Sequence, residues 1–426
     1  MSSGKKINLI AANMGYGHQR AAYPLLGLCE NQIITINDYP AMTTWERNYW
    51  RNSLRSYERI SRFKKIPLIG KLIFSIMDYF QKIEPFYPFR DLSKQSVQQK
   101  FFYSLVKKGL GKNLINSLNT EGLPIVTTFF VVAYVAEYYN YSGDIYCIVC
   151  DADIARAWAP INPEASRIQY FVPNGQVKER LLMYGVKSNN IIESGFPLPK
   201  ENIGANKEII MEDLEKRIQV LDPFGKFKKE YEHLLGEKKG KTQISEERPL
   251  TISYAVGGAG AQKETGIIIL NKLVRNIKSK KIKLNLVAGN RPEVKKYFEQ
   301  EISRLGLEGD GGVSVVFAED KFEYFRIFNQ CLRQTDILWT KPSELSFYCA
   351  LGLPIIISET VGSQEDFNRD WLVSVGAGIN SIDVEYVSEW LNDLMESGRL
   401  IRAAVDGFLN AEQMGAYNIE KIILKK

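Results

Sequence analysis

The sequence predicts an α/β protein made of two doubly wound domains that face a cleft. In each half of the 426-residue chain, short apolar runs rich in β-branched residues alternate with stretches of helical character, a pattern typical of parallel sheets. The chain is also too long for one ordinary compact domain. Because ligands of such sheets bind at the carboxyl ends of the strands, we expect the functional site in the cleft between the halves.

Each predicted strand is a short apolar run followed by a loop. The runs are residues 7–12, 33–38, 123–130 and 144–151 in the first half, and 250–256, 282–289, 313–318, 336–340 and 354–358 in the second. We therefore expect a Rossmann-like N-terminal domain over 1–199, with an amphipathic insertion at about 44–110, and a Rossmann-like C-terminal domain over 249–426 that ends in helices. The Lys- and Glu-rich stretch 200–248 shows no strand pattern and is predicted to be a linker with solvated helices.

Composition and charge exclude several classes of protein. Hydrophobic residues make up 45% and charged residues 24%, which is ordinary for a globular protein. A net charge of +6 is too small to indicate a nucleic-acid partner, and no nucleic-acid motif is present. With only 2 histidines, no His-rich metal site is expected, and no cofactor is indicated. The N-terminal apolar stretch is too short for a signal peptide, and no run of about 18 apolar residues exists, so we expect a cytoplasmic protein.

Residues 44–80 are aromatic, basic and amphipathic. Arginines recur every four residues and fall on one helical face, and aromatic residues fall on the opposite arc. On one interpretation this is a membrane-surface element, in which Trp45 and Trp50 enter the interface while Arg51 and Arg55 face anionic headgroups. The alternative is a helix packed on its own domain with its arginines in water.

Loops that follow strands of the second half carry the residue types of a phosphate and sugar site. Glycines let the backbone approach a ligand closely, a helix N-terminus attracts phosphate, and a lysine with nearby amide and hydroxyl groups suits a sugar phosphate. The alternatives are an ordinary tight turn at the glycines and a helix cap at Ser343. The candidate donor-binding residues are Gly257, Gly258, Gly260, Gly289, Asn290, Lys341, Ser343, Glu344, Gln364, Glu365 and Asn368.

Segments spread over most of the chain carry a resemblance to a known family, and they occur in the family's order. They are the loop Gly15-Tyr16-Gly17-His18, Asp151 to Trp158, and the stretches 171–197, 340–357, 362–368 and 375–378. Together they resemble glycosyltransferases of the GT-B type. The resemblance is closest to family 28, which holds the peptidoglycan N-acetylglucosaminyltransferase and the diacylglycerol galactosyl- and glucosyltransferases.

The resemblance implies an inverting transfer, without bound metal, from a nucleotide-diphosphate sugar such as a UDP-sugar to a lipid or lipid-linked acceptor. Such an enzyme would be peripheral at the inner face of the membrane. The C-terminal half would hold the donor, and Lys341 would stabilise the departing diphosphate. His18, in the acceptor loop shaped by Gly15 and Gly17, would deprotonate the acceptor, with Asp151 as the second candidate for this base.

The chain also departs from the family pattern, which leaves two other functions open. Ser343 and Glu344 stand where the family has two glycines, the family's ribose-binding glutamate has no counterpart, and a histidine is absent between Asp151 and Trp158. One alternative is a sugar-nucleotide 2-epimerase of the same fold, which would need several active-site acids and no membrane element. The other is a non-catalytic GT-B-type subunit that binds a partner.

Overall fold

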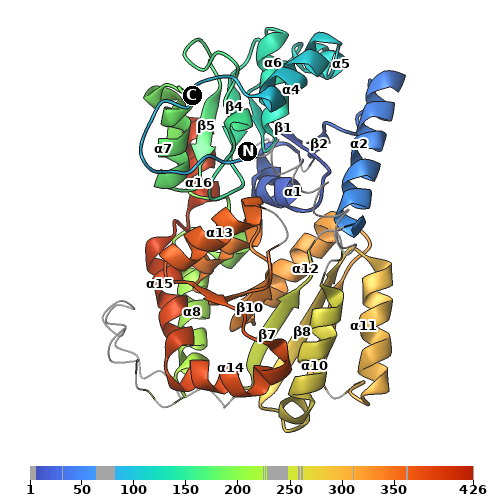
Figure 1. The fold of residues 1–426 in the computed structure, drawn as a ribbon, viewed down its shortest axis with the longest axis vertical. Coiled ribbons are helices and arrows are strands. Elements are labelled where there is room, and N and C mark those ends of the chain that lie inside the picture. Colours follow the sequence, from blue (N-terminus) through green and yellow to red (C-terminus); the bar gives the residue numbers. More distant parts are fainter. Residues whose placement is uncertain are drawn as a thin grey trace. The chain divides into compact units, whose positions relative to one another are not determined.

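The chain folds into two compact units (Figure 1). The computed structural model describes residues 6–30, 32–63, 82–223, 225, 227, 248–257, 260, 262–309, 311–360 and 363–425. The first unit comprises Met1–Leu198, Val361–Asn368 and Met414–Lys426, and the second comprises Pro199–Thr360 and Arg369–Gln413. The break after Leu198 lies close to the predicted end of the N-terminal domain. The last helix groups with the first unit, which differs from the predicted C-terminal domain.

The first unit is built on a six-stranded parallel sheet with the order β2-β1-β3-β4-β5-β6. Its strands are β1 (Asn8–Ala11), β2 (Ile34–Thr35), β3 (Ile125–Thr127), β4 (Ile145–Ile148), β5 (Gln169–Val172) and β6 (Ile191–Glu193). Its helices are α1 (Gly17–Ala22), η1 (Tyr23–Leu28), α2 (Thr44–Phe63), α4 (Val97–Lys107), α5 (Lys112–Leu118), α6 (Phe130–Tyr138), η2 (Arg156–Trp158), α7 (Gly175–Met183), η3 (Ser188–Asn190) and α16 (Gly415–Leu424). Strands β1, β3 and β4 are buried along their whole length, because helices cover both faces of the sheet.

The second unit repeats this architecture with the strand order β12-β11-β10-β7-β8-β9, again all parallel. Its strands are β7 (Leu250–Ala255), β8 (Ile282–Gly289), β9 (Val313–Phe317), β10 (Ile337–Thr340), β11 (Ile355–Ile357) and β12 (Gly378–Asn380). Its helices are η4 (Lys200–Asn202), α8 (Glu208–Leu221), α10 (Lys263–Lys278), α11 (Pro292–Arg304), α12 (Lys321–Arg333), η6 (Glu344–Leu351), η7 (Val384–Tyr386), α14 (Val387–Glu396) and α15 (Arg399–Asn410). Helix α13 (Ser363–Ser374) begins in the first unit and continues in the second.

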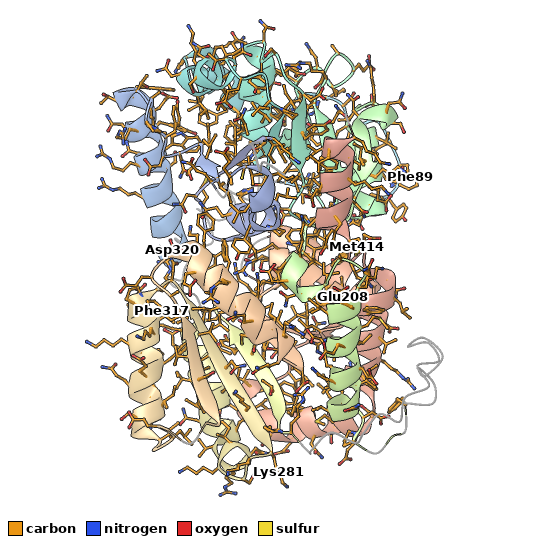
Figure 2. The ribbon with its side chains drawn as sticks, turned by 180° about the vertical axis from the view of Figure 1, so that it is seen from behind. Phe89, Glu208, Lys281, Phe317, Asp320 and Met414 are labelled. Carbon is orange, nitrogen blue, oxygen red and sulfur yellow. The ribbon has the colours of Figure 1, made fainter. Side chains whose placement is uncertain are left out.

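Each sheet has one switch point, which is the place between two neighbouring strands from which the chain continues to opposite sides of the sheet. In the first sheet this point lies between β1 and β3, and in the second it lies between β7 and β10. Open α/β sheets bind their ligands at the carboxyl ends of the strands at such points. Figure 2 marks the two ends of the second sheet: Phe317 and Asp320 lie at the carboxyl end of β9, and Lys281 lies at the amino end of β8.

Residues 200–248 were predicted to be a linker with solvated helices, but one helix of this segment, α8, is partly buried. Three apolar residues of α8, Ile210, Leu214 and Ile218, are buried, and α8 packs against α15. Its Arg217 is also buried and donates hydrogen bonds to the carbonyl oxygens of Thr335 and Leu351, each at 2.8 Å. The spacing of these apolar residues is that of an amphipathic helix, which the high content of charged residues obscured.

Helix α2 is fixed to the first unit by a buried carboxylate. Glu46 accepts hydrogen bonds from the Tyr39 hydroxyl at 2.7 Å, the Gly111 amide at 2.7 Å and the Thr43 amide at 2.9 Å. Burial, together with the neighbouring Glu46 carboxylate, raises the pKa of Tyr39. Both carboxylate oxygens of Glu46 therefore have hydrogen-bond partners inside the unit, so Glu46 does not pair with the exposed arginines of α2.

The structure corrects one predicted membrane contact. Trp50 is 3% exposed and packs in the core, with its ring centre 6.3 Å from that of Phe129. In the folded unit its side chain therefore cannot contact a membrane. Trp45 remains 40% exposed, and Arg51 and Arg55 are exposed on the same helix. Among the described residues, no helix combines the length and the apolar character needed to cross a bilayer.

Candidate active site

His18 lies at the switch point of the first sheet, in the first turn of α1, which follows the loop after β1. Its Nδ1 atom is 2.6 Å from the carbonyl oxygen of Thr128, the residue that follows β3. Since a carbonyl oxygen only accepts, Nδ1 carries the proton, and in the neutral ring the lone pair is on Nε2. The Thr128 hydroxyl donates to the His18 carbonyl oxygen at 2.9 Å, and the Phe129 ring meets the imidazole edge-on at 5.2 Å. These contacts orient the ring in the tautomer that a general base needs.

The glycines beside His18 have different roles. Gly15 has a φ of +82°, a backbone conformation that side chains rarely adopt, and no described atom lies within 4 Å of the place where its Cβ would stand. The turn itself therefore requires glycine at this position, without any constraint from packing. Gly17 is the first residue of α1, which carries His18.

Asp151 follows β4, and its carboxylate accepts hydrogen bonds from two amides of α13. Asn368 donates from Nδ2 to Oδ1 at 3.3 Å, and Gln364 donates from Nε2 to Oδ2. Asn368 is also buried and accepts the Ala152 amide hydrogen on its Oδ1 atom at 2.8 Å. The structure thus brings two residues predicted to bind the donor onto the loop of a candidate base, and both belong to the first unit. Glu365 lies between them in the sequence and is half-buried.

The other carboxylate of this loop, Asp153, anchors the loop to α7. Arg180 donates to Asp153 from Nε at 2.8 Å and from Nη2 at 2.7 Å, and Gln176 adds a third hydrogen bond at 2.9 Å. Both side chains of the ion pair are fully buried. The sequence Asp-x-Asp in this loop resembles a metal-binding motif. The Asp153 carboxylate, however, pairs with the Arg180 guanidinium and holds the loop in place.

Gly257 and Lys341 meet at the switch point of the second sheet. They follow β7 and β10, whose last residues, Ala255 and Thr340, are paired across the sheet. A Cβ atom at Gly257 would stand 2.6 Å from Cε of Lys341, so a larger residue would displace the end of the lysine side chain from this place. Gly260, with φ +68°, completes the turn by donating its amide hydrogen to the Gly257 carbonyl oxygen at 2.7 Å.

Sequence reasoning missed two further basic residues, Arg291 beside this turn and Lys321 near Arg291. The Cδ atom of Arg291, which follows β8, is 3.7 Å from the place of a Cβ at Gly260. Burial and the charge of Arg291 lower the pKa of Lys321, the first residue of α12, to about 8. A basic residue shortly after each of two predicted strands was the available signal. Lys341, Arg291 and Lys321 thus follow the carboxyl ends of β10, β8 and β9, respectively.

The remaining predicted donor residues have more ordinary surroundings. The Ser343 hydroxyl caps η6 by accepting from the Leu345 amide at 3.5 Å, as the alternative interpretation expected, and Glu344 begins that helix. Gly289 ends β8 with φ +72°, and Asn290 follows it half-buried. Gly258 lies outside the described residues.

Comparison with known proteins identifies relatives for most of the chain. It is 22% identical over 389 residues to the processive diacylglycerol β-glucosyltransferase of Bacillus subtilis (strain 168), covering 89% of this chain and 84% of that protein. It is 25% identical over 296 residues to the protein of the same name from Bacillus cytotoxicus, covering 68% of this chain and 64% of that protein, just under two thirds of its length. The resemblance to glycosyltransferase family 28 is confirmed.

Two other comparisons concern the fold and the second half. MurG of Acinetobacter baumannii aligns with a TM-score of 0.50 and 12% identity over 99% of this chain and 100% of that chain, which supports the GT-B fold. A family described as a domain of unknown function, DUF6938, matches residues 237–424. The predicted fold of two Rossmann-like domains is therefore confirmed.

Proposed function

We propose that this protein is an inverting, metal-independent glycosyltransferase that moves a sugar from a UDP-sugar to a diacylglycerol-type or lipid-linked acceptor. The single observation that carries the proposal is the approach of Lys341 and Arg291 to the glycine turn at the switch point of the second sheet. A glycine turn with cations beside it, at the carboxyl ends of parallel strands, suits the negative charge of a nucleotide diphosphate. The names of the Bacillus relatives support a lipid acceptor.

These cations also give the leaving group its stabilisation. When the sugar is transferred, negative charge develops on the departing diphosphate, and preorganised cations at that place lower the barrier most. In the first unit, His18 would take the proton of the acceptor hydroxyl on Nε2 while Nδ1 stays bonded to Thr128. Asp151 is the second candidate for this base.

Nucleotide binding in the absence of metal tests the proposal directly. We expect calorimetry in EDTA to detect UDP and UDP-glucose, and excess ligand at 100 times its dissociation constant to add about 2.7 kcal/mol to the free energy of unfolding. Incubation of UDP-glucose with diacylglycerol should then yield a glycolipid. Binding that requires manganese would contradict the metal-independent mechanism. Formation of a 2-epimerised sugar nucleotide, without a glycolipid, would show that the protein is an epimerase and would contradict the proposed transferase activity.

The lowered pKa of Lys321 predicts how donor affinity depends on pH. Below about pH 8 the free protein carries Lys321 charged, and above it this side chain becomes neutral. An anionic diphosphate favours the charged form, so binding above that pKa must take up a proton. UDP-glucose affinity should therefore fall by about tenfold per pH unit as pH rises above the pKa. In Lys321→Met the affinity should be lower at neutral pH and nearly independent of pH in this range; an unchanged slope would show that Lys321 does not face the diphosphate.

We further propose that α2 attaches the protein to an anionic membrane surface, in keeping with a lipid acceptor. Arg47, Arg51, Arg55 and Trp45 of this helix are exposed, while Glu46 fixes the start of the helix to the first unit. This arrangement holds a basic, partly aromatic surface in a defined position on the first unit.

Liposome retention tests the role of α2. Arg51→Glu combined with Arg55→Glu should weaken binding to anionic liposomes by about 2 kcal/mol or more, roughly thirtyfold, since each basic residue near such a surface contributes about 1 kcal/mol. Lys107→Glu with Lys108→Glu is the matched control, because these exposed lysines lie at the end of α4. Equal losses in both pairs would indicate a general charge effect, and equal retention on neutral liposomes would exclude the basic face.

A further inference from the structure

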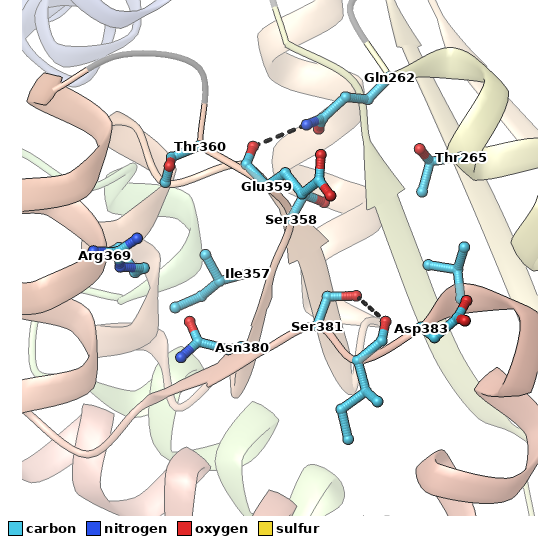
Figure 3. Close-up of a pocket in the computed structure, with 12 residues that line it drawn as sticks. Gln262, Thr265, Ile357, Ser358, Glu359, Thr360, Arg369, Asn380, Ser381 and Asp383 are labelled. Atoms are coloured by element: carbon cyan, nitrogen blue, oxygen red, sulfur yellow. Dashed lines mark hydrogen bonds between the residues drawn. The ribbon is translucent and has the colours of Figure 1, made fainter.

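Helix α13 is shared between the two units. Its residues up to Asn368 group with the first unit, and those from Arg369 onward group with the second. In the second unit, Arg369 lines a pocket of about 780 Å³ beyond the carboxyl ends of β11 and β12 (Figure 3). The first-unit part of α13 carries two side-chain amides, those of Gln364 and Asn368, which stand four residues apart and therefore lie on one face of the helix. Both amides contact the loop after β4.

Asn368 is closed to solvent, and both polar atoms of its side chain are bonded within the first unit. The residue is 1% exposed. Its Oδ1 atom accepts the Ala152 amide hydrogen at 2.8 Å, and its Nδ2 atom donates to Oδ1 of Asp151 at 3.3 Å. An amide buried in this way reaches a ligand only by giving up these partners, which is costly for a buried polar group. This geometry suits a side chain that holds the loop better than one that binds a sugar.

The loop after β4 is held by side chains from two helices. Asn174, the N-cap of α7, donates from Nδ2 to the Ala152 carbonyl oxygen at 3.2 Å, so side-chain amides bond both backbone polar groups of Ala152. The neighbouring Asp153 is held by an ion pair with α7. On the other side of Ala152, the two α13 amides donate to different oxygens of Asp151. The α13 amides therefore do for Asp151 what α7 does for Asp153.

We propose that Gln364 and Asn368 are positioning residues, which fix the Asp151 carboxylate in one orientation for sugar transfer and do not bind the sugar of the donor. Two donors that approach different oxygens from one helix face restrict rotation of the carboxylate. A displacement of about 1 Å at a reacting group can lower a rate by about a hundredfold, so the amides act on turnover through Asp151. This inference rests on the proposed function, in which Asp151 is a candidate base.

Gln364→Met tests the positioning of Asp151. The change removes one amide donor at a half-buried place and keeps the length of the side chain, so the protein should fold. We expect kcat to fall about tenfold or more, while the affinity for UDP-glucose, measured by calorimetry in EDTA, stays within about twofold. A lower affinity with an unchanged kcat would assign Gln364 to the donor, and no change in either would leave it without a role; each result would overturn the proposal.

Exchanging the amide and the carboxylate tests the hydrogen bonds themselves. Asn368→Asp alone sets two carboxylates against each other, so its Tm should fall by about 2–4 °C or more at about pH 8. The Tm should recover toward about pH 5, where one of the pair takes up a proton. In the double variant Asp151→Asn with Asn368→Asp, the amide at position 151 donates and the carboxylate at position 368 accepts. The net charge and the hydrogen bonds are then conserved, so Tm and UDP-glucose affinity should return to those of the unaltered protein, while turnover stays low.

Asn380→Asp is the matched control, because it makes the same change at an exposed residue of the second unit (Figure 3). Its Tm should follow that of the unaltered protein at every pH. A double variant no more stable than Asn368→Asp would overturn the proposed hydrogen bonds, full turnover in it would overturn the positioning role, and a lost affinity for UDP-glucose would place Asn368 at the donor. Tm and affinity are measured without an acceptor, so absence of transfer by the unaltered protein would contradict the proposed function separately.

Discussion

His18→Ala should lower the turnover of sugar transfer by about 10²–10⁴-fold, the usual contribution of a positioned general base. An acceptor hydroxyl attacks poorly unless its proton is taken as the new bond forms. The hydrogen bond from Nδ1 to the Thr128 carbonyl oxygen fixes the imidazole in the tautomer that accepts this proton on Nε2. Donor affinity should stay nearly unchanged, because the proposed donor residues around Gly257 belong to the second unit. Turnover and UDP-glucose affinity are measured separately to check this.

Asp151→Asn separates the two candidate bases. The amide keeps the size of the carboxylate and an oxygen that accepts a hydrogen bond from Gln364 or Asn368, so the loop should remain folded. If Asp151→Asn alone abolishes turnover and His18→Ala costs less than about tenfold, Asp151 is the base and His18 shapes the loop. If an active enzyme tolerates both changes, neither residue carries the proton. If no donor is transferred by the unaltered protein, the non-catalytic alternative applies.

Arg180→Met should destabilise the protein by about 3–5 kcal/mol, since it leaves the buried carboxylate of Asp153 without its guanidinium. Thermal unfolding followed by circular dichroism measures the loss. For a unit of this size we expect a decrease in Tm of about 6–20 °C. Turnover should fall with it, because Asp153 fixes the loop that carries Asp151.

The double variant Asp153→Leu with Arg180→Met is the control for this prediction. Replacing both charges removes the cost of an unpaired buried carboxylate, so the double variant should be more stable than Arg180→Met alone. If the two are equally unstable, packing of the arginine stem, with its guanidinium 5.1 Å from the centre of the Phe86 ring, would account for the loss in place of charge pairing.

The sequence by itself determined the class of the fold and the place of the main loops. Buried parallel strands need apolar side chains on both faces, so β1, β4, β7, β8 and β10 are predominantly apolar runs that can be found without tertiary information. Strands β5, β6 and β12 escaped prediction; β6 and β12 are short, partly buried edge strands, whereas β5 is an interior strand that is largely buried. The run at 123–130 was predicted to be strand throughout, but its last phenylalanine begins α6, since an apolar run alone does not separate a strand from a buried helix.

The candidate site was partly predictable for the same reason. His18, Gly257 and Lys341 each follow a predicted strand and Asp151 ends one, and in a parallel sheet all the carboxyl ends of the strands lie along one edge. The order of the strands, which the sequence does not state, places His18 beside Thr128 and Gly257 beside Lys341.

Only the tertiary structure decided which polar side chains meet. It buried Trp50 in the core and bonded Asn368 to the loop of Asp151, and it brought Arg291 to the glycine turn. A hydrogen bond or an ion pair depends on separations of a few ångströms between residues far apart in the chain, whereas periodicity reports only which face of an element is apolar. Sequence patterns therefore specified the sheets and their loops, and packing specified the partners within them.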